Sequence, residues 1–145
     1  METSTAFASI ALAAVFWDGR LTMAGSRALR HSLDYRKPFS DYSDAAMVAM
    51  MDSLVNTLRL KGAQHMMVEA ADQLEPSQRM TAFTVAAEIM RSDGAYQADE
   101  RNILDNLASV LDLDAGFTTQ VMTVMDALHA NLDVPVPALP LQHGA

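Results

Sequence analysis

Two acidic residues flank a glycine turn in the second half of the chain, where Asp93 precedes Gly94 and Glu100 follows six residues later. A second Asp-Gly pair begins at Asp18, 75 residues earlier (93 − 18). Carboxylate oxygens are the ligands that hard divalent cations take in proteins. If the two turns lie together, Asp18, Asp93 and Glu100 would hold a divalent cation, the only cofactor that the sequence suggests.

The turn at Asp93 resembles an EF-hand loop only in its second half, where Gly94 is followed by Glu100 at the correct spacing. An EF-hand needs oxygen ligands at the first, third and fifth positions of the loop. Those positions fall on Ile89, Arg91 and Asp93, and two of these side chains cannot bind calcium. The sequence therefore excludes an EF-hand.

Helix termination offers a structural explanation for the same residues. Gly94 would end the helix before the turn, and Asp99 and Glu100 would lie in the first turn of the next helix, where the helix dipole favours negative charge by about 0.3–1 kcal/mol. Glu100 also occupies the capping-box position, with Gln97 as a poor N-cap. In the first copy Gly25 stands in the place of Glu100, so a metal site would be single and centred on the second turn.

Other catalytic motifs are missing from the sequence. There is no cysteine, no Glu-x-x-His pair, no His-Glu-x-x-His, no glycine-rich phosphate loop and no Gly-x-Ser-x-Gly elbow. The 11 methionines fit core filling better than a soft-metal site. We therefore expect a protein that is not an enzyme.

Hydrophobic periodicity and helix-ending residues predict an all-α protein, a compact bundle of about seven helices with an internal helix-turn-helix duplication. The expected helices span about 4–17, 23–33, 44–60, 63–74, 76–92, 98–111 and 115–131. Thr22, Ser43 or Asp44, and Asp114 are the expected N-caps, and Gly62 should end the third helix. Residues 34–43 should form a loop.

The apolar residues of each helix predict which face is buried. The first helix is apolar on nearly all sides, so it should be buried on most of them. The inward residues expected for the fifth and seventh helices are Met80, Phe83, Ala87 and Met90, and Phe117, Val121, Val124, Met125, Leu128 and Leu132. Trp17 should close one end of the bundle, with a role as partner anchor as the alternative.

Composition restricts the class of protein further. The chain has 145 residues and a net charge of −8, which argues against nucleic-acid binding. The absence of cysteine suggests a cytoplasmic protein, and no stretch approaches the roughly 20 apolar residues of a transmembrane helix. We expect one helical domain over 1–133 and a proline-rich, flexible tail over 134–145.

Charge is unevenly distributed along the chain. Residues 20–37 carry five basic side chains against one acidic residue, whereas residues 93–133 carry eight acidic side chains against one basic residue. Two solvated faces explain this pattern. The alternative is that these faces meet a protein partner or mediate self-association.

The stretch from Leu74-Glu75-Pro76-Ser77-Gln78-Arg79 through Asp93-Gly94 to Glu100 and on to Leu111-Asp112-Leu113-Asp114 resembles the TerB-like family of tellurite-resistance proteins. The resemblance covers about residues 64–131, and a weaker copy covers 4–33. It implies an all-helical, duplicated fold in a cytoplasmic protein of the tellurite or general stress response. It also implies that Asp18, Asp93 and Glu100 are the acidic residues that bind metal.

Overall fold

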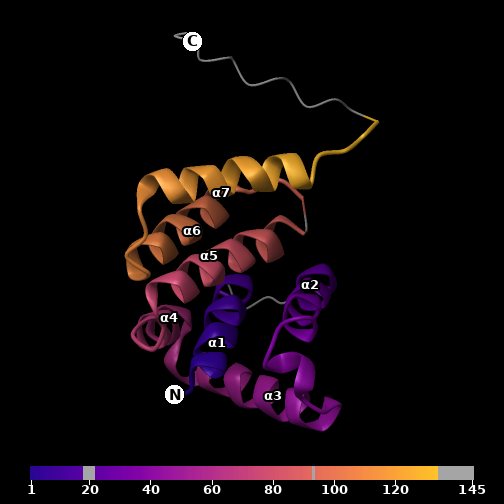
Figure 1. Cartoon of the computed structure of the whole chain (residues 1–145), viewed down its shortest axis with the longest axis vertical. Coiled ribbons are helices and arrows are strands. Elements are labelled where there is room, and N and C mark those ends of the chain that lie inside the picture. The colour runs from indigo at the N-terminus through magenta and orange to yellow at the C-terminus, as the bar shows by residue number, and fades with distance from the viewer. Residues whose placement is uncertain (18–21, 93, 134–145) are drawn as a thin grey trace.

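A computed structural model describes residues 1–17, 22–92 and 94–133, which form seven α-helices and one short 3-10 helix (Figure 1). No strand occurs among these residues, which confirms the all-α prediction. The elements are α1 (Thr3–Val15), α2 (Met23–Asp34), η1 (Phe39–Asp41), α3 (Asp44–Lys61), α4 (Ala63–Ala71), α5 (Pro76–Arg91), α6 (Ala98–Val110) and α7 (Ala115–Leu128).

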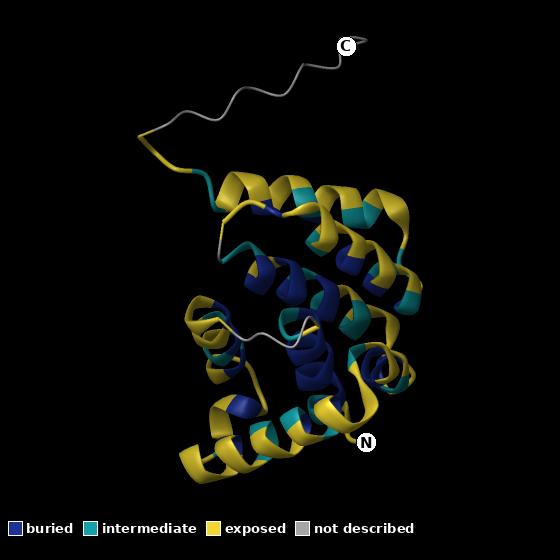
Figure 2. Cartoon of the chain, turned by 180° about the vertical axis from the view of Figure 1, so that it is seen from behind, coloured by how far each residue is buried: buried dark blue, intermediate teal, exposed yellow. Residues whose placement is uncertain are grey.

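Helix α1 is the centre of the molecule. Every residue from Ala6 to Ala14 is buried, which confirms the prediction from its all-round apolarity. Figure 2 shows the buried residues gathered on the helices at the centre of the molecule. Helix α7, next to the C-terminal end of the chain, is mostly exposed in the same view. Six of the nine buried residues of α1 are alanine or serine, and these small side chains allow neighbouring helices to approach it closely.

The two predicted helical pairs are α1–α2 and α5–α6, and each helix of one pair contacts at least one helix of the other pair. Helix α1 packs most extensively against α4 and α5, α2 also packs against α5, and α6 also contacts α1. An internal two-fold axis would produce this arrangement, with α1–α2 equivalent to α5–α6. The duplication itself stays a prediction.

The predicted helix ends agree closely with the structure. Thr22, Ser43 and Asp114 each accept a hydrogen bond from a first-turn backbone N–H, at 2.9, 3.1 and 3.2 Å respectively. Gly62 ends α3 with a φ of 88°, a left-handed conformation that favours glycine. Helices α1, α4 and α7 end two or three residues earlier than predicted.

The predicted inward face of α7 is partly wrong. Phe117, Val121 and Met125 lie in or against the core. However, the side chains of Val124, Leu128 and Leu132 are 56%, 59% and 100% exposed. The expected inward residue Met80 on α5 is also 42% exposed. Helix α7 lies at the edge of the bundle and packs chiefly on α5, so only a narrow stripe of its surface is covered (Figure 1).

The segment between α2 and α3 is more ordered than a polar loop. It contains η1, in which Phe39 is buried, with its ring centroid 6.3 Å from that of Phe7 and 5.6 Å from that of Tyr42. This aromatic contact attaches the segment to α1.

Two other predictions concern parts of the chain outside the described residues, namely the Asp18-Gly19 turn and the tail over 134–145. Among the helices described, none combines the length and apolarity needed to cross a bilayer.

Candidate functional site

A groove of about 310 Å³ lies between the two helical pairs, and we call it the turn groove. Its lining includes Trp17, Thr22 and Gly25 near the first predicted turn, and Gln97, Asp99 and Glu100 near the second. Val15, Ile89 and Met90 contribute apolar wall. Residues that border the two predicted turns therefore meet at one hollow of the surface.

Glu100 folds back onto the start of its own helix. The backbone N–H of Gln97 donates a hydrogen bond to Glu100 Oε1 at 2.9 Å, as the capping-box alternative predicted. Asp99 Oδ1 accepts from the backbone N–H of Glu100 at 3.0 Å. One oxygen of Glu100 is thus already engaged in helix capping.

The predicted metal site cannot be assembled from Glu100 alone. Its two other proposed ligands, Asp18 and Asp93, lie outside the described residues. Over 1–17, 22–92 and 94–133, no three His, Asp or Glu side chains are grouped as metal ligands would be. The metal site therefore stays a prediction.

Gly25 lies where the predicted duplication would place the counterpart of Glu100, and the local packing explains the glycine. A Cβ placed on Gly25 would lie 3.0 Å from Thr22 Oγ1 and 3.1 Å from Val15 Cγ1, closer than most real Cβ contacts. Helix α2 approaches α1 so closely here that a long side chain would have to displace its neighbours. Close packing thus accounts for glycine at the position that the predicted duplication matches to Glu100.

Trp17 and Asp99 also line a second groove of about 430 Å³, which we call the amide groove. It runs between α4 and α6 and carries the amides of Gln64, Asn102 and Asn106. Asn106 Nδ2 donates to Gln64 Oε1 at 2.6 Å. Sequence reasoning missed these amides because they lie on exposed helix faces, where amide side chains carry no special signal.

Trp17 is 42% exposed and lies where the turn groove and the amide groove meet. The indole therefore presents an accessible aromatic surface at this end of the bundle. Tryptophan in such a position is a common anchor for a protein partner.

Tyr96, just after the second turn, was also missed by the sequence analysis. Its hydroxyl donates to the carbonyl oxygen of Ala87 at 2.6 Å. The guanidinium carbons of Arg91 and Arg101 lie 6.0 and 5.8 Å from its ring centroid. Burial raises the pKa of Tyr96 to about 12, although Arg91 and Arg101 act in the opposite direction.

Tyr96→Phe should lower the free energy of unfolding by about 1 kcal/mol at neutral pH, because the buried hydrogen bond to Ala87 is lost.

An unfolded tyrosine ionises near pH 10.0 but the folded one near pH 12, so the unfolded state loses its proton first. Stability of the unmodified chain should therefore fall through this interval. Urea unfolding between pH 7 and pH 12 measures both effects.

Tyr35→Phe is the matched control for Tyr96→Phe, because Tyr35 is 80% exposed. It should leave stability unchanged at neutral pH. An equal alkaline loss of stability in the Tyr96→Phe variant and in the unmodified chain would show that Tyr96 is not the group responsible.

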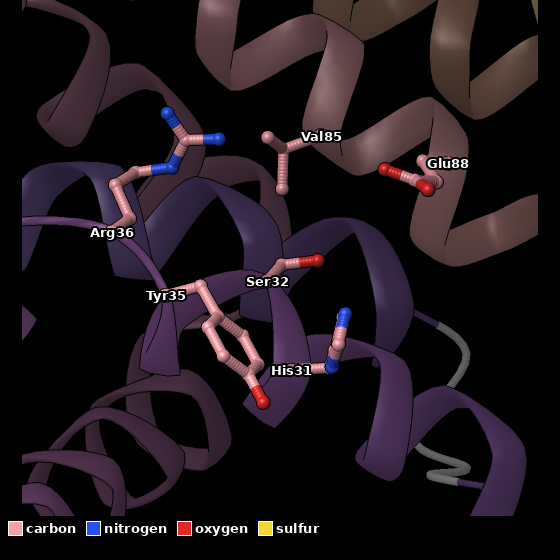
Figure 3. A pocket seen from close by; sticks show the side chains of 6 residues that line it. All are labelled: His31, Ser32, Tyr35, Arg36, Val85 and Glu88. Atoms are coloured by element: carbon pink, nitrogen blue, oxygen red, sulfur yellow. The ribbon is translucent and has the colours of Figure 1, made fainter. Parts of the chain in front are cut away.

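A third hollow, of about 430 Å³, lies between α2 and α5 and carries residue types that could do acid–base chemistry (Figure 3). His31 and Ser32 come from α2, and Glu88 from α5. The His31 ring packs against Tyr35 with centroids 4.9 Å apart. Within the described part of the chain, no hydrogen bond joins His31, Ser32 and Glu88, so a nucleophile and base are not paired here.

Comparison with protein-family models, with curated proteins and with solved structures finds no match for this chain. The function must therefore be argued from the chemistry of these surfaces.

Proposed function

We propose that this chain is a non-enzymatic, cytoplasmic, TerB-like binding module of the tellurite or general stress response, and that its ligand binds at the turn groove. The observation that carries the proposal is the meeting of both helical pairs at one groove, with Asp99 and Glu100 on one wall and Trp17 beside them. An exposed indole next to carboxylates suits recognition of a positively charged group.

The shape of the turn groove favours a cationic segment of a protein partner over a single metal ion. Its volume of about 310 Å³ and its apolar wall of Val15, Ile89 and Met90 would accommodate a lysine or arginine side chain with its aliphatic stem. A divalent cation would need Asp18 and Asp93 to lie beside the second carboxylate oxygen of Glu100. Both ligands can be compared in one experiment.

Trp17 is the only tryptophan in the chain, so its fluorescence reports on the turn groove directly. We expect an arginine- and leucine-containing peptide to change this fluorescence saturably and to raise the melting temperature. At a free ligand concentration of 100 times Kd, binding stabilises a protein by about 2.7 kcal/mol. Parallel titrations with Mg²⁺, Ca²⁺, Mn²⁺ and Zn²⁺ test the metal alternative.

Glu100→Gln provides a sharp variant, because glutamine can still cap the helix while the negative charge is removed. It should weaken peptide binding and leave the melting temperature of the free protein nearly unchanged. Asp105→Asn, an exposed change on the same helix, is the control for net charge. A metal-induced shift that disappears in Asp93→Asn would instead identify a cation site, and no response to any ligand would refute the proposal.

A second candidate function is self-association as a scaffold, which we propose from the exposed apolar stripe of α7. Val124 and Leu128 are one helical turn apart and more than half exposed. A helix at the edge of a bundle with such a stripe can bury it against a second copy.

Size-exclusion chromatography with light scattering, at low and high salt, tests this candidate. A dimer that dissociates in Leu128→Glu but not in Thr119→Glu, an exposed change on the opposite face of the same helix, would support it. A monomer at every salt and protein concentration would exclude it.

A further inference from the structure

A groove of about 500 Å³ lies at the opposite end of α1 from the turn groove, and we call it the α1 N-terminal groove. Its apolar wall consists of Phe7, Pro38, Phe39 and Leu74, which come from α1, η1 and the segments that precede η1 and α5. Small-molecule sites typically measure about 300–1,000 Å³ and are mostly apolar with a few polar groups. This groove fits both criteria.

Two basic side chains, Arg36 and Lys37, lie at the rim of this groove. The guanidinium carbon of Arg36 is 5.4 Å from the centroid of the Phe7 ring, which places a positive charge directly beside the apolar wall. In the part of the chain that the structure describes, the basic side chains within ion-pair distance of a carboxylate are Arg30, Lys61, His65 and Arg91. Arg36 and Lys37 are therefore not neutralised by any described carboxylate.

The charge balance at the rim favours an anion. Glu2 is the one carboxylate that lines the groove, and it forms no ion pair with Arg36 or Lys37. The lining side chains thus carry a net charge of +1 (two cations and one anion), in a chain whose overall charge is −8.

Gln78, on α5, adds an uncharged donor to the lining of the groove. Its Oε1 accepts a hydrogen bond from the backbone N–H of Glu75 at 2.8 Å. This contact fixes the amide and leaves its Nε2 amino group to donate elsewhere. The groove therefore combines an apolar wall with cationic and amide donors.

We propose that the α1 N-terminal groove binds an amphiphilic monocarboxylate, such as a medium-chain fatty acid. The alkyl chain lies along Phe7, Phe39 and Leu74, and the carboxylate pairs with Arg36 and Lys37. A small inorganic anion would make no contact with the apolar wall, and a neutral alkane derivative would leave the cations unpaired. Only a ligand with both parts uses both features of the groove.

Isothermal titration of the full chain with decanoate, below its micelle concentration, tests the proposal. Decanol, acetate and decyltrimethylammonium are the matched probes, because each lacks one feature of decanoate or reverses its charge. We expect decanoate to bind at least about tenfold more tightly than any of them, because decanol and decyltrimethylammonium lose the charged hydrogen bond and acetate lacks the apolar contacts of the alkyl chain. Equal binding of decanoate and decyltrimethylammonium would overturn the proposal.

Variants locate the two parts of the ligand. Arg36→Gln combined with Lys37→Gln should weaken decanoate binding about tenfold or more. Arg27→Gln combined with Arg59→Gln makes the same charge change away from the groove and should leave binding unchanged. Thr81→Phe, which fills part of the groove, should also weaken binding. Thermal melts confirm that each variant is folded, and unchanged affinity in the Arg36/Lys37 variant would overturn the proposal.

Two further measurements distinguish a soluble carboxylate from a membrane surface, and the α1 N-terminal groove from the turn groove. Vesicles of phosphatidylglycerol present an anionic amphiphile as a membrane, and the proposal expects binding to soluble decanoate without binding to vesicles. Binding to vesicles alone would overturn it. Glu100→Gln should leave decanoate affinity unchanged, so this inference stands or fails independently of the turn groove.

Discussion

Leu12→Ala should lower the free energy of unfolding by about 2–5 kcal/mol, the range typical of a leucine removed from a packed core. Leu12 is 0% exposed, on a helix that packs against α4 and α5 at once. Alanines such as Ala11 and Ala13 beside it hold the backbones close, so the surrounding helices have little freedom to collapse into the cavity. Urea unfolding at neutral pH measures the loss.

Leu60→Ala is the control for Leu12→Ala, because Leu60 is 82% exposed on α3. It should change the free energy of unfolding by less than about 0.5 kcal/mol. Similar effects of the two substitutions would mean that α1 is not the centre of the fold. Since domains of this kind are stabilised by about 5–15 kcal/mol, Leu12→Ala alone should remove a large share of the total.

The sequence predicted the central helix because its apolarity leaves no face suited to water. The same reasoning located three of the four expected inward residues of α5, since Phe83, Ala87 and Met90 are all buried. It failed on α7, where Val124 and Leu128 continue the apolar pattern but are more than half exposed. Periodicity identifies an apolar face, whereas only the arrangement of helices determines how much of that face is covered.

The chemistry of the second turn was predictable because helix capping is local. Gln97 and Glu100 are three residues apart, and their hydrogen bond follows from that spacing. For the turn groove, the sequence predicted only that the two turns would lie together. It did not predict the groove itself or its apolar wall. Gln64 and Asn106, 42 residues apart in the chain, come together through the packing of α4 on α6, which no local pattern encodes.

Phe39→Ala should lower the free energy of unfolding by about 3–5 kcal/mol, the cost of removing a buried phenylalanine. The sequence suggested only a polar loop here. In the structure, Phe39 is 2% exposed and packs against Phe7 and Tyr42, so one side chain attaches η1 to the central helix. Thermal and urea unfolding should both show the loss.

Tyr35→Ala is the control for Phe39→Ala, because it removes an aromatic ring that is 80% exposed from the start of the same segment. Its effect should stay within about 0.5 kcal/mol. A comparably small effect of Phe39→Ala would mean that the segment contributes little to the core.

Because Phe39 also forms part of the apolar wall of the α1 N-terminal groove, folded Phe39→Ala should bind decanoate more weakly, while Tyr35→Ala should bind it normally. Phe39 therefore contributes both to the stability of the fold, through its contact with Phe7 on α1, and to the apolar wall of the groove.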